Sequence, residues 1–321
     1  MSKITGLLTT IITTHKQTPV ILQGSIYVVI YWYQPLSANH FFKTITMKTL
    51  VVPVDFSAAS SNAASYALDF AKAINGNITL IHVCQVPVPF SEVSAPPYTL
   101  TELVQDTETR IKDIKLELTK QAGETVKVYT EVLEGHITTE IETYCKVSKP
   151  FAIVMGASGS GAMERLMFGS NTLAAARHFS WPLIIVPKEA RFKNINRIGL
   201  ACDLLNVKQS LHIGEIKKLV NEFNAELHVL HVISKKTGNP AEKEIEESKW
   251  LKEMLGEMKP VFHFMTNSNI DDAINEFSVN NQLNLLVVIP KKHGLIDSLI
   301  HKSHTKQLIL HTHVPLMAIH E

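Results

Sequence analysis

The chain carries the same series of short apolar segments twice, and this internal repeat restricts the possible folds more than any other feature of the sequence. Residues 50–55 (LVVPVD) correspond to residues 198–203 (IGLACD), and each is an apolar run that ends in aspartate. Three more pairs follow in the same order: 77–83 with 225–232, 151–155 with 285–289, and 181–186 with 314–319. We therefore predict two copies of one structural unit, in residues 47–190 and 191–321.

The apolar runs are rich in Val, Ile and Leu and do not alternate with polar residues, as is typical of strands buried on both faces of a parallel sheet. Amphipathic stretches lie between them. Residues 60–74 stop before Asn75 and Gly76, and residues 101–122 stop before Gly123, which are helix-ending signals. Strands that alternate with helices predict an α/β fold: two doubly wound, Rossmann-like domains, each a five-stranded, mainly parallel sheet flanked by helices. Such sheets bind ligands outside the carboxyl ends of their strands, at the switch point of the strand order.

Composition and charge exclude several classes of protein. Of the 321 residues, 45% are hydrophobic and 19% are charged, which is typical of a globular chain with a full core. The 31 basic and 30 acidic residues leave a net charge of +1, so we expect neither nucleic acid nor a membrane as a partner. Cys84, Cys145 and Cys202 are widely separated and form no C-x-x-C pair, so no disulfide framework or cysteine zinc site is expected, and the predicted location is cytoplasmic.

Residues 1–46 differ from the rest of the chain. They show no helical period, and their one apolar stretch, residues 26–33, is far shorter than the ~20 residues that span a bilayer. Met47 is followed directly by the first apolar run, as at a natural protein start. We expect residues 1–46 to be an N-terminal extension that is not part of the fold, the product of an over-extended start codon.

The motif with the most chemical content follows the third paired run of the first unit. Residues 156–170 read G-x2-G-x9-G-S, and a helical stretch, residues 171–178, comes next. Glycines let a phosphate approach the backbone closely, and the free N–H groups at a helix start bind anions. The chain has no Gly-Lys-[ST] and no G-x-G-x-x-G after its first strand, which disfavours a P-loop kinase and a standard dinucleotide domain. The alternative interpretation is a glycine-rich surface turn without a ligand.

With these motifs the first unit resembles an ATP-binding domain of the universal stress protein family, and residues 47–321 together resemble a tandem member of that family. The resemblance implies an adenine nucleotide alpha hydrolase-like fold, bound ATP together with Mg²⁺, and a role in the stress response. It also implies an internal pseudo-dimer of the two units through their last strands, or a homodimer, and a protein partner that the sequence does not identify.

The same resemblance implies which residues bind the nucleotide. Pro53-x-Asp55 ends the first strand, with Asp55 toward the adenine or ribose, and Val83 lines the adenine pocket. The remaining positions lie under the nucleotide or hold its ribose and phosphates: Met155, Gly156, Gly159, Gly169, Ser170, Asn171 and Thr172. A second interpretation applies to Asp55, which suits a cap for the helix that begins near residue 57. His82 and Val83 also suit strand-core residues with one edge toward the pocket.

The second unit departs from this pattern. Its glycines after residue 289 are largely replaced, and Lys302 stands in the place of Gly169, although Asp203 and Ser303 keep their places. We therefore expect no ATP in the second unit, whose predicted role is to pair with the first and cover its sheet edge. His301 and His304 have a spacing that could bind zinc, but His311 and His313 cannot share one helix face and no carboxylate completes the set, so no metal site is predicted there.

No nucleophile and base, paired carboxylates or reactive cysteine can be recognised in the sequence, so no catalytic residue is predicted. The sequence favours an ATP-binding stress-response or signalling protein with at most slow hydrolysis. Two alternatives remain open: an ATP-hydrolysing or adenylating enzyme on a related fold, and a nucleotide-free interaction module.

Overall fold

The structure is a computed structural model that describes residues 48–85, 100–157, 170–204, 207–234, 242–290 and 313–319. The predicted extension, residues 1–46, lies outside these ranges. All the described residues belong to one compact unit, Met47–Glu321.

The first half alternates strands and helices in the predicted order. Its elements are β1 (Thr49–Pro53), α2 (Ala58–Ala73), β2 (Asn77–Cys84), α3 (Leu100–Ala122), β3 (Val128–Glu134), α4 (Ile137–Ser148), β4 (Ala152–Gly156), α5 (Ser170–His178) and β5 (Leu183–Val186).

The second half follows the same alternation, with one helix divided in two. Its elements are β6 (Arg197–Ala201), α6 (Val207–Ser210), α7 (Ile213–Phe223), β7 (Glu226–Ser234), α8 (Glu242–Met254), the 3₁₀ turn η2 (Gly256–Met258), β8 (Val261–Asn267), α9 (Ile270–Asn280), β9 (Leu285–Val288) and β10 (Leu316–Ala318).

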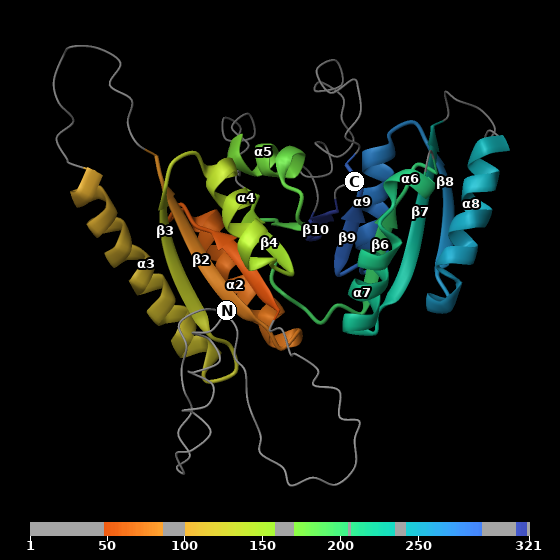
Figure 1. The fold of residues 1–321 in the computed structure, drawn as a ribbon. Helices are drawn as coiled ribbons and strands as arrows, with labels where there is room; N and C mark the ends of the chain where they lie inside the picture. Colours follow the sequence, from red (N-terminus) through yellow and green to blue (C-terminus); the bar gives the residue numbers. More distant parts are fainter. Residues whose placement is uncertain are drawn as a thin grey trace, which may run out of the picture. The chain divides into compact units, whose positions relative to one another are not determined.

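The described strands form one ten-stranded sheet in the order β3-β2-β1-β4-β5-β10-β9-β6-β7-β8 (Figure 1). The order 3-2-1-4-5 of the first half thus recurs as 8-7-6-9-10 in the second. Neighbouring strands within each half are parallel. The halves meet where β5 and β10 pair antiparallel, with Leu316 opposite Ile185. The prediction of an α/β fold with a mainly parallel sheet flanked by helices is confirmed.

Helices cover both faces of the sheet. One apolar cluster joins α2, α3, α7 and α8 to one face. A second cluster joins α4, α5 and α9 to the other face. The uninterrupted apolar runs of the sequence become strands with both faces buried, and all four residues of β5 and of β9 are buried. No helix among the described residues combines the length and apolar character that crossing a bilayer requires.

The repeat extends to the turns of the backbone. Phe56 (φ 63°) and Leu204 (φ 54°) each follow the aspartate after the first strand of their half. Asn75 (φ 51°) and Asn224 (φ 48°) end α2 and α7 in the left-handed region. Bulky residues rarely adopt a positive φ, so its recurrence at equivalent positions shows that both halves make the same turns.

Aromatic side chains from both halves pack together on the face of the sheet that α2 and α7 cover. Phe70 of α2 lies 5.2 Å from Phe223 of α7 and 5.7 Å from Phe192, between ring centroids. An ion pair joins Lys48 to Glu222 beside this cluster. The two halves therefore share one continuous core on this face.

Candidate functional site

The candidate site lies at the carboxyl ends of β1, β2 and β4. β1 pairs with β2 on one side and with β4 on the other. From β1 the chain first adds β2 and β3 on one side of β1, and it then adds β4 and β5 on the other side. The direction in which strands are added therefore reverses between β1 and β4, which is the switch point of the first half. The strand ends bring the predicted residues Pro53, Asp55, Val83 and Met155 to one edge of the sheet.

Asp55 follows β1 with an exposed carboxylate. Its Oδ1 accepts the backbone N–H of Ser57 at 3.0 Å, while Ser57 is the N-cap of α2 and accepts the N–H of Ser60 at 3.1 Å. The residue that caps α2 is therefore Ser57, and Asp55 orders the turn before it. Partial burial raises the pKa of Asp55, but the hydrogen bonds from Ser57 and Ser60 outweigh it, so the pKa lies below its usual value. The carboxylate is held ionised and still faces solvent.

His82 and Val83 lie near the end of β2, beside this turn. Nδ1 of His82 lies 2.7 Å from the Val54 carbonyl oxygen, which can only accept, so Nδ1 carries the hydrogen. His82 is half-buried, whereas Val83 is 9% exposed and packs in the same apolar cluster as Met155. Val83 and Met155 thus belong to the apolar packing near the edge that carries Asp55.

Phe56 and Arg110 are part of this edge, although sequence reasoning missed both. The Phe56 ring stacks on His82 with centroids 4.7 Å apart, and the Arg110 guanidinium of α3 lies 4.0 Å from the Phe56 ring centre. The left-handed backbone of Phe56 directs its ring, and Arg110 arrives from a distant helix. Neither the left-handed backbone of Phe56 nor the approach of Arg110 can be recognised in the local sequence.

Gly156, the last residue of β4, makes the closest backbone approach at the site. A Cβ atom on it would lie 2.3 Å from the Ala59 carbonyl oxygen in the first turn of α2. Thr172 is 4% exposed, and its hydroxyl donates to the Gly156 carbonyl oxygen at 3.2 Å. The first turn of α5 is thereby fixed against the end of β4, so Gly156 and Thr172 have a structural role in addition to the predicted one.

α5 begins at Ser170, and Asn171 belongs to its first turn. The predicted ligand residues Gly159 and Gly169, with the rest of the glycine motif between them, lie outside the described residues, as do Lys302 and Ser303 of the second half. Within the described ranges, no three His, Cys, Asp or Glu side chains are grouped so that they could hold a metal ion.

The equivalent edge of the second half keeps the scaffold but changes the surface. Nδ1 of His231 lies 3.0 Å from the Cys202 carbonyl oxygen, as His82 does from Val54. Leu204 stands in place of Phe56, and Pro290 follows the strand where Gly156 ends it. Two shorter helices, α6 and α7, take the place that the single helix α2 has in the first half.

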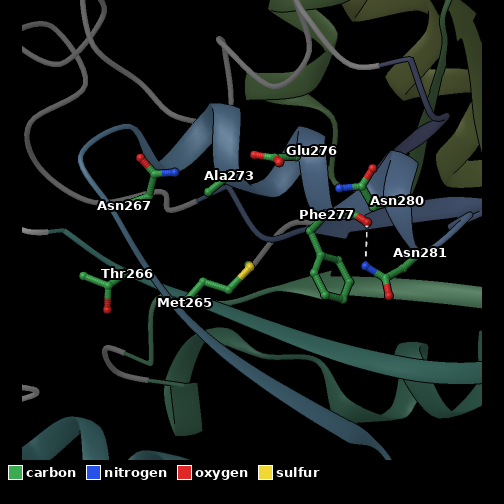
Figure 2. Close-up of a pocket in the computed structure, with 8 residues that line it drawn as sticks. All are labelled: Met265, Thr266, Asn267, Ala273, Glu276, Phe277, Asn280 and Asn281. Carbon is green, nitrogen blue, oxygen red and sulfur yellow. Dashed lines mark hydrogen bonds between the residues drawn. The ribbon is translucent and has the colours of Figure 1, made fainter.

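A pocket of about 270 Å³ lies between β8 and α9, away from the predicted site (Figure 2). Met265 and Phe277 supply its apolar surface, and Glu276 of α9 supplies a carboxylate. Polar amide and hydroxyl groups complete the lining: Thr266, Asn267, Asn280 and Asn281. Sequence reasoning assigned no role to these residues.

Comparison with known proteins agrees with this architecture. A model described as the universal stress protein family matches residues 46–187. A universal stress protein of Methanocaldococcus jannaschii is 32% identical over 143 residues, which are 44% of this chain and 82% of that protein.

Among solved structures, a universal stress protein from Archaeoglobus fulgidus matches with a TM-score of 0.63 and 17% identity, over 85% of this chain and 96% of that chain. A universal stress protein in complex with cAMP matches with 21% identity and a TM-score of 0.34, over 43% of this chain and 96% of that chain. Because the sequence is 32% identical to the M. jannaschii protein over 82% of that protein's length, this chain belongs to the universal stress protein family.

Proposed function

We propose that the first half binds an adenine nucleotide, ATP with Mg²⁺, and that the protein acts in stress response or signalling through this occupancy. The observation that carries the proposal is the convergence of Asp55, Val83, Met155 and the start of α5 at the switch point of the first half. Doubly wound sheets bind their ligands at this place.

Each part of the site suits one part of the nucleotide. The apolar side chains of Val83 and Met155 suit the face of an adenine ring. The exposed, ionised carboxylate of Asp55 suits an amino or hydroxyl donor of the adenine or ribose. Free N–H groups in the first turn of α5, which Thr172 fixes to β4, suit the phosphates, together with Gly159, Gly169, Ser170 and Asn171 of the motif.

We further propose that residues 191–321 form a second domain of the same family without a nucleotide site. The recurrence of the strand order and of the left-handed turns supports this division. Pro290 replaces Gly156 and Lys302 replaces Gly169, which removes the close backbone approach that a phosphate needs. The role of this domain is to pair β10 with β5 and so complete the sheet.

The cytoplasm remains the proposed location. Cys84, Cys145 and Cys202 form no disulfide within the described part of the chain, in keeping with a reducing compartment.

The first test is to purify the full chain, denature it, and identify any released nucleotide by chromatography and mass. We expect one ATP per chain. Two per chain would show that the second half also binds, and none, together with no Mg-ATP binding by calorimetry, would favour the nucleotide-free interaction module.

A pair of matched variants locates the site. Gly169→Lys places the residue of the second half into the first, and we expect it to abolish nucleotide binding. Lys302→Ala, at the equivalent position of the second half, is expected to leave binding unchanged. Steady release of phosphate or pyrophosphate from bound ATP by the unaltered chain would favour the enzyme alternative.

A further inference from the structure

A chain of charged and titratable side chains crosses the outer strands of the second half. Arg197 begins β6, and its Nε lies 3.4 Å from Oε2 of Glu226, which begins β7. The same Glu226 oxygen lies 3.4 Å from Nε2 of His228. Nδ1 of His228 in turn lies 3.0 Å from Nε2 of His263 on β8. We call these four residues the β8 latch.

Burial of His228 makes its contact with His263 sensitive to charge. His228 is 7% exposed, and its Nε2 makes no hydrogen bond among the described residues, so its contact with Glu226 is electrostatic. His263 is half-buried, and Phe277 of α9 packs 4.5 Å from it and 6.3 Å from His228, between ring centroids. Water therefore screens a charge on His228 poorly, whereas His263 keeps partial contact with solvent.

The neighbouring elements place few other charges against the pair. On α9 the residue that contacts both imidazoles is the apolar Phe277, while Glu276 lines the adjacent pocket (Figure 2). Asp271 and Asp272 lie in the first turn of α9, at the opposite end of the helix from Phe277. β8 carries no charged residue besides His263 in Val261–Asn267. Glu226 is therefore the carboxylate that lies against the pair, and Arg197 is ion-paired with that carboxylate.

The 3.0 Å contact has room for one hydrogen. The Glu226 carboxylate favours a hydrogen on Nε2 of His228, which leaves Nδ1 as an acceptor for the N–H of His263. A first added proton can be shared between the two rings, because one hydrogen still lies between them. A second proton sets two N–H groups and two positive charges against each other, and the contact must break.

We propose that the β8 latch is an acid-sensitive device that holds β8 and α9 on the second half while at most one imidazole is charged and releases them when both are. β8 is the last strand of the described sheet and pairs only with β7. The His228–His263 contact therefore adds to the ladder and to the core packing of Phe262 and Met265 in holding this strand. Release also frees Phe277, which forms part of the neighbouring pocket.

The direction of titration agrees with this device. Burial lowers the pKa of His263, the charge of His228 lowers it further, and Glu226 opposes both. A histidine with a lowered pKa in the folded state contributes stability that is complete above the unfolded value of ~6.5 and is lost as pH falls below it. The latch is thus closed at neutral pH and opens in acid.

Hydrogen exchange with mass spectrometry on the full chain, at about pH 7.5 and about pH 5 and corrected for the chemical exchange rate, tests the proposal. We expect peptides of β8 and α9 to lose about tenfold or more of their protection in acid, the factor that the loss of one hydrogen bond to a charged group represents. Peptides of β1 and β2 are the internal control and are expected to keep theirs. Unchanged protection of β8, or an equal loss in all peptides, would overturn the proposal.

Variants separate titration from packing. His263→Gln keeps an N–H near the position of Nε2 but cannot be charged, so β8 is expected to remain protected at both pH values. His212→Gln alters an exposed histidine at the start of α7 whose side chain makes no cap hydrogen bond, and it is expected to behave as the unaltered chain. Acid loss in His263→Gln equal to that of the unaltered chain would refute the latch. If His263→Gln misfolds, ¹³C-histidine NMR of the unaltered chain decides, since the proposal requires two resonances that titrate as a coupled pair.

Discussion

The two halves of the sheet present the same scaffold with different surfaces at the carboxyl ends of their strands. Both halves place an aspartate and a left-handed residue after their first strand and anchor a histidine of the second strand to the neighbouring carbonyl. The first half adds a glycine at the end of β4 and a continuous α2, whereas the second has Pro290 and the divided α6 and α7. The comparison shows that the turns belong to the fold, so the features that the second half lacks are the ones to test for ligand binding.

The strongest test of a shared scaffold concerns the core that joins the halves. Phe70 is fully buried between rings of both halves, so Phe70→Ala is expected to cost about 3–5 kcal/mol of unfolding free energy. The matched change Phe264→Ala, at a ring that is 52% exposed on β8, is expected to cost less than ~1 kcal/mol. Urea denaturation measures both, and equal losses would contradict a common core.

Asp55 and Asp203 test whether equivalent carboxylates have different functions. Asp55→Asn weakens a charge-assisted contact, so we expect ATP affinity to fall by about 1.5–3 kcal/mol, or roughly 10- to 150-fold. Asp203→Asn is expected to leave affinity unchanged. Titration calorimetry compares the two, and equal effects would show that the halves do not differ in this way.

The lowered pKa of Asp55 adds a pH dependence to the same comparison. Since the folded chain ionises this carboxyl at lower pH than the unfolded chain does, its contribution to stability is present above its usual pKa of 3.8. It is lost as pH falls through the lowered folded value. Asp55→Asn is therefore expected to make the unfolding free energy slightly less dependent on pH in acid.

Gly156 tests the close approach of β4 to α2. Gly156→Ala places a Cβ atom against the Ala59 carbonyl oxygen, and we expect a loss of about 1–3 kcal/mol. Gly214→Ala in α7 is the control, because no atom lies within 4 Å of the new methyl group, and it is expected to stabilise by up to ~1 kcal/mol. Thermal unfolding distinguishes the two, and a neutral Gly156→Ala would mean that α2 shifts freely.

The smallest expected effect concerns thiol reactivity. Burial raises the pKa of Cys145 to about 12, with a further contribution from Glu142, so this thiol is expected to resist alkylation in the folded chain. Cys202, half-buried in the second half, is expected to react first. Peptide mapping after limited labelling at neutral pH checks this order, and early modification of Cys145 would contradict it.

Several features of the site were predictable from local sequence. The uninterrupted apolar runs predicted parallel strands, and the aspartate after residue 54 predicted a polar group at their carboxyl edge, as Asp55 shows. The β8 latch was not predictable, because His228 and His263 lie on different strands and meet only through the register that places Leu230 opposite His263. Arg110 and the pocket beside α9 were missed for the same reason.

By itself, the sequence determined the repeated apolar runs, the class of the fold and the presence of a polar group where the first strand ends, since apolar periodicity and turn residues act over a few neighbours. Only the tertiary structure decided that Ser57 rather than Asp55 caps α2, that the Thr172 hydroxyl points back to Gly156, and that Nδ1 of His228 meets Nε2 of His263. These outcomes depend on which side chains meet across strands and helices. The packing of the whole chain, and not any local preference, sets those distances.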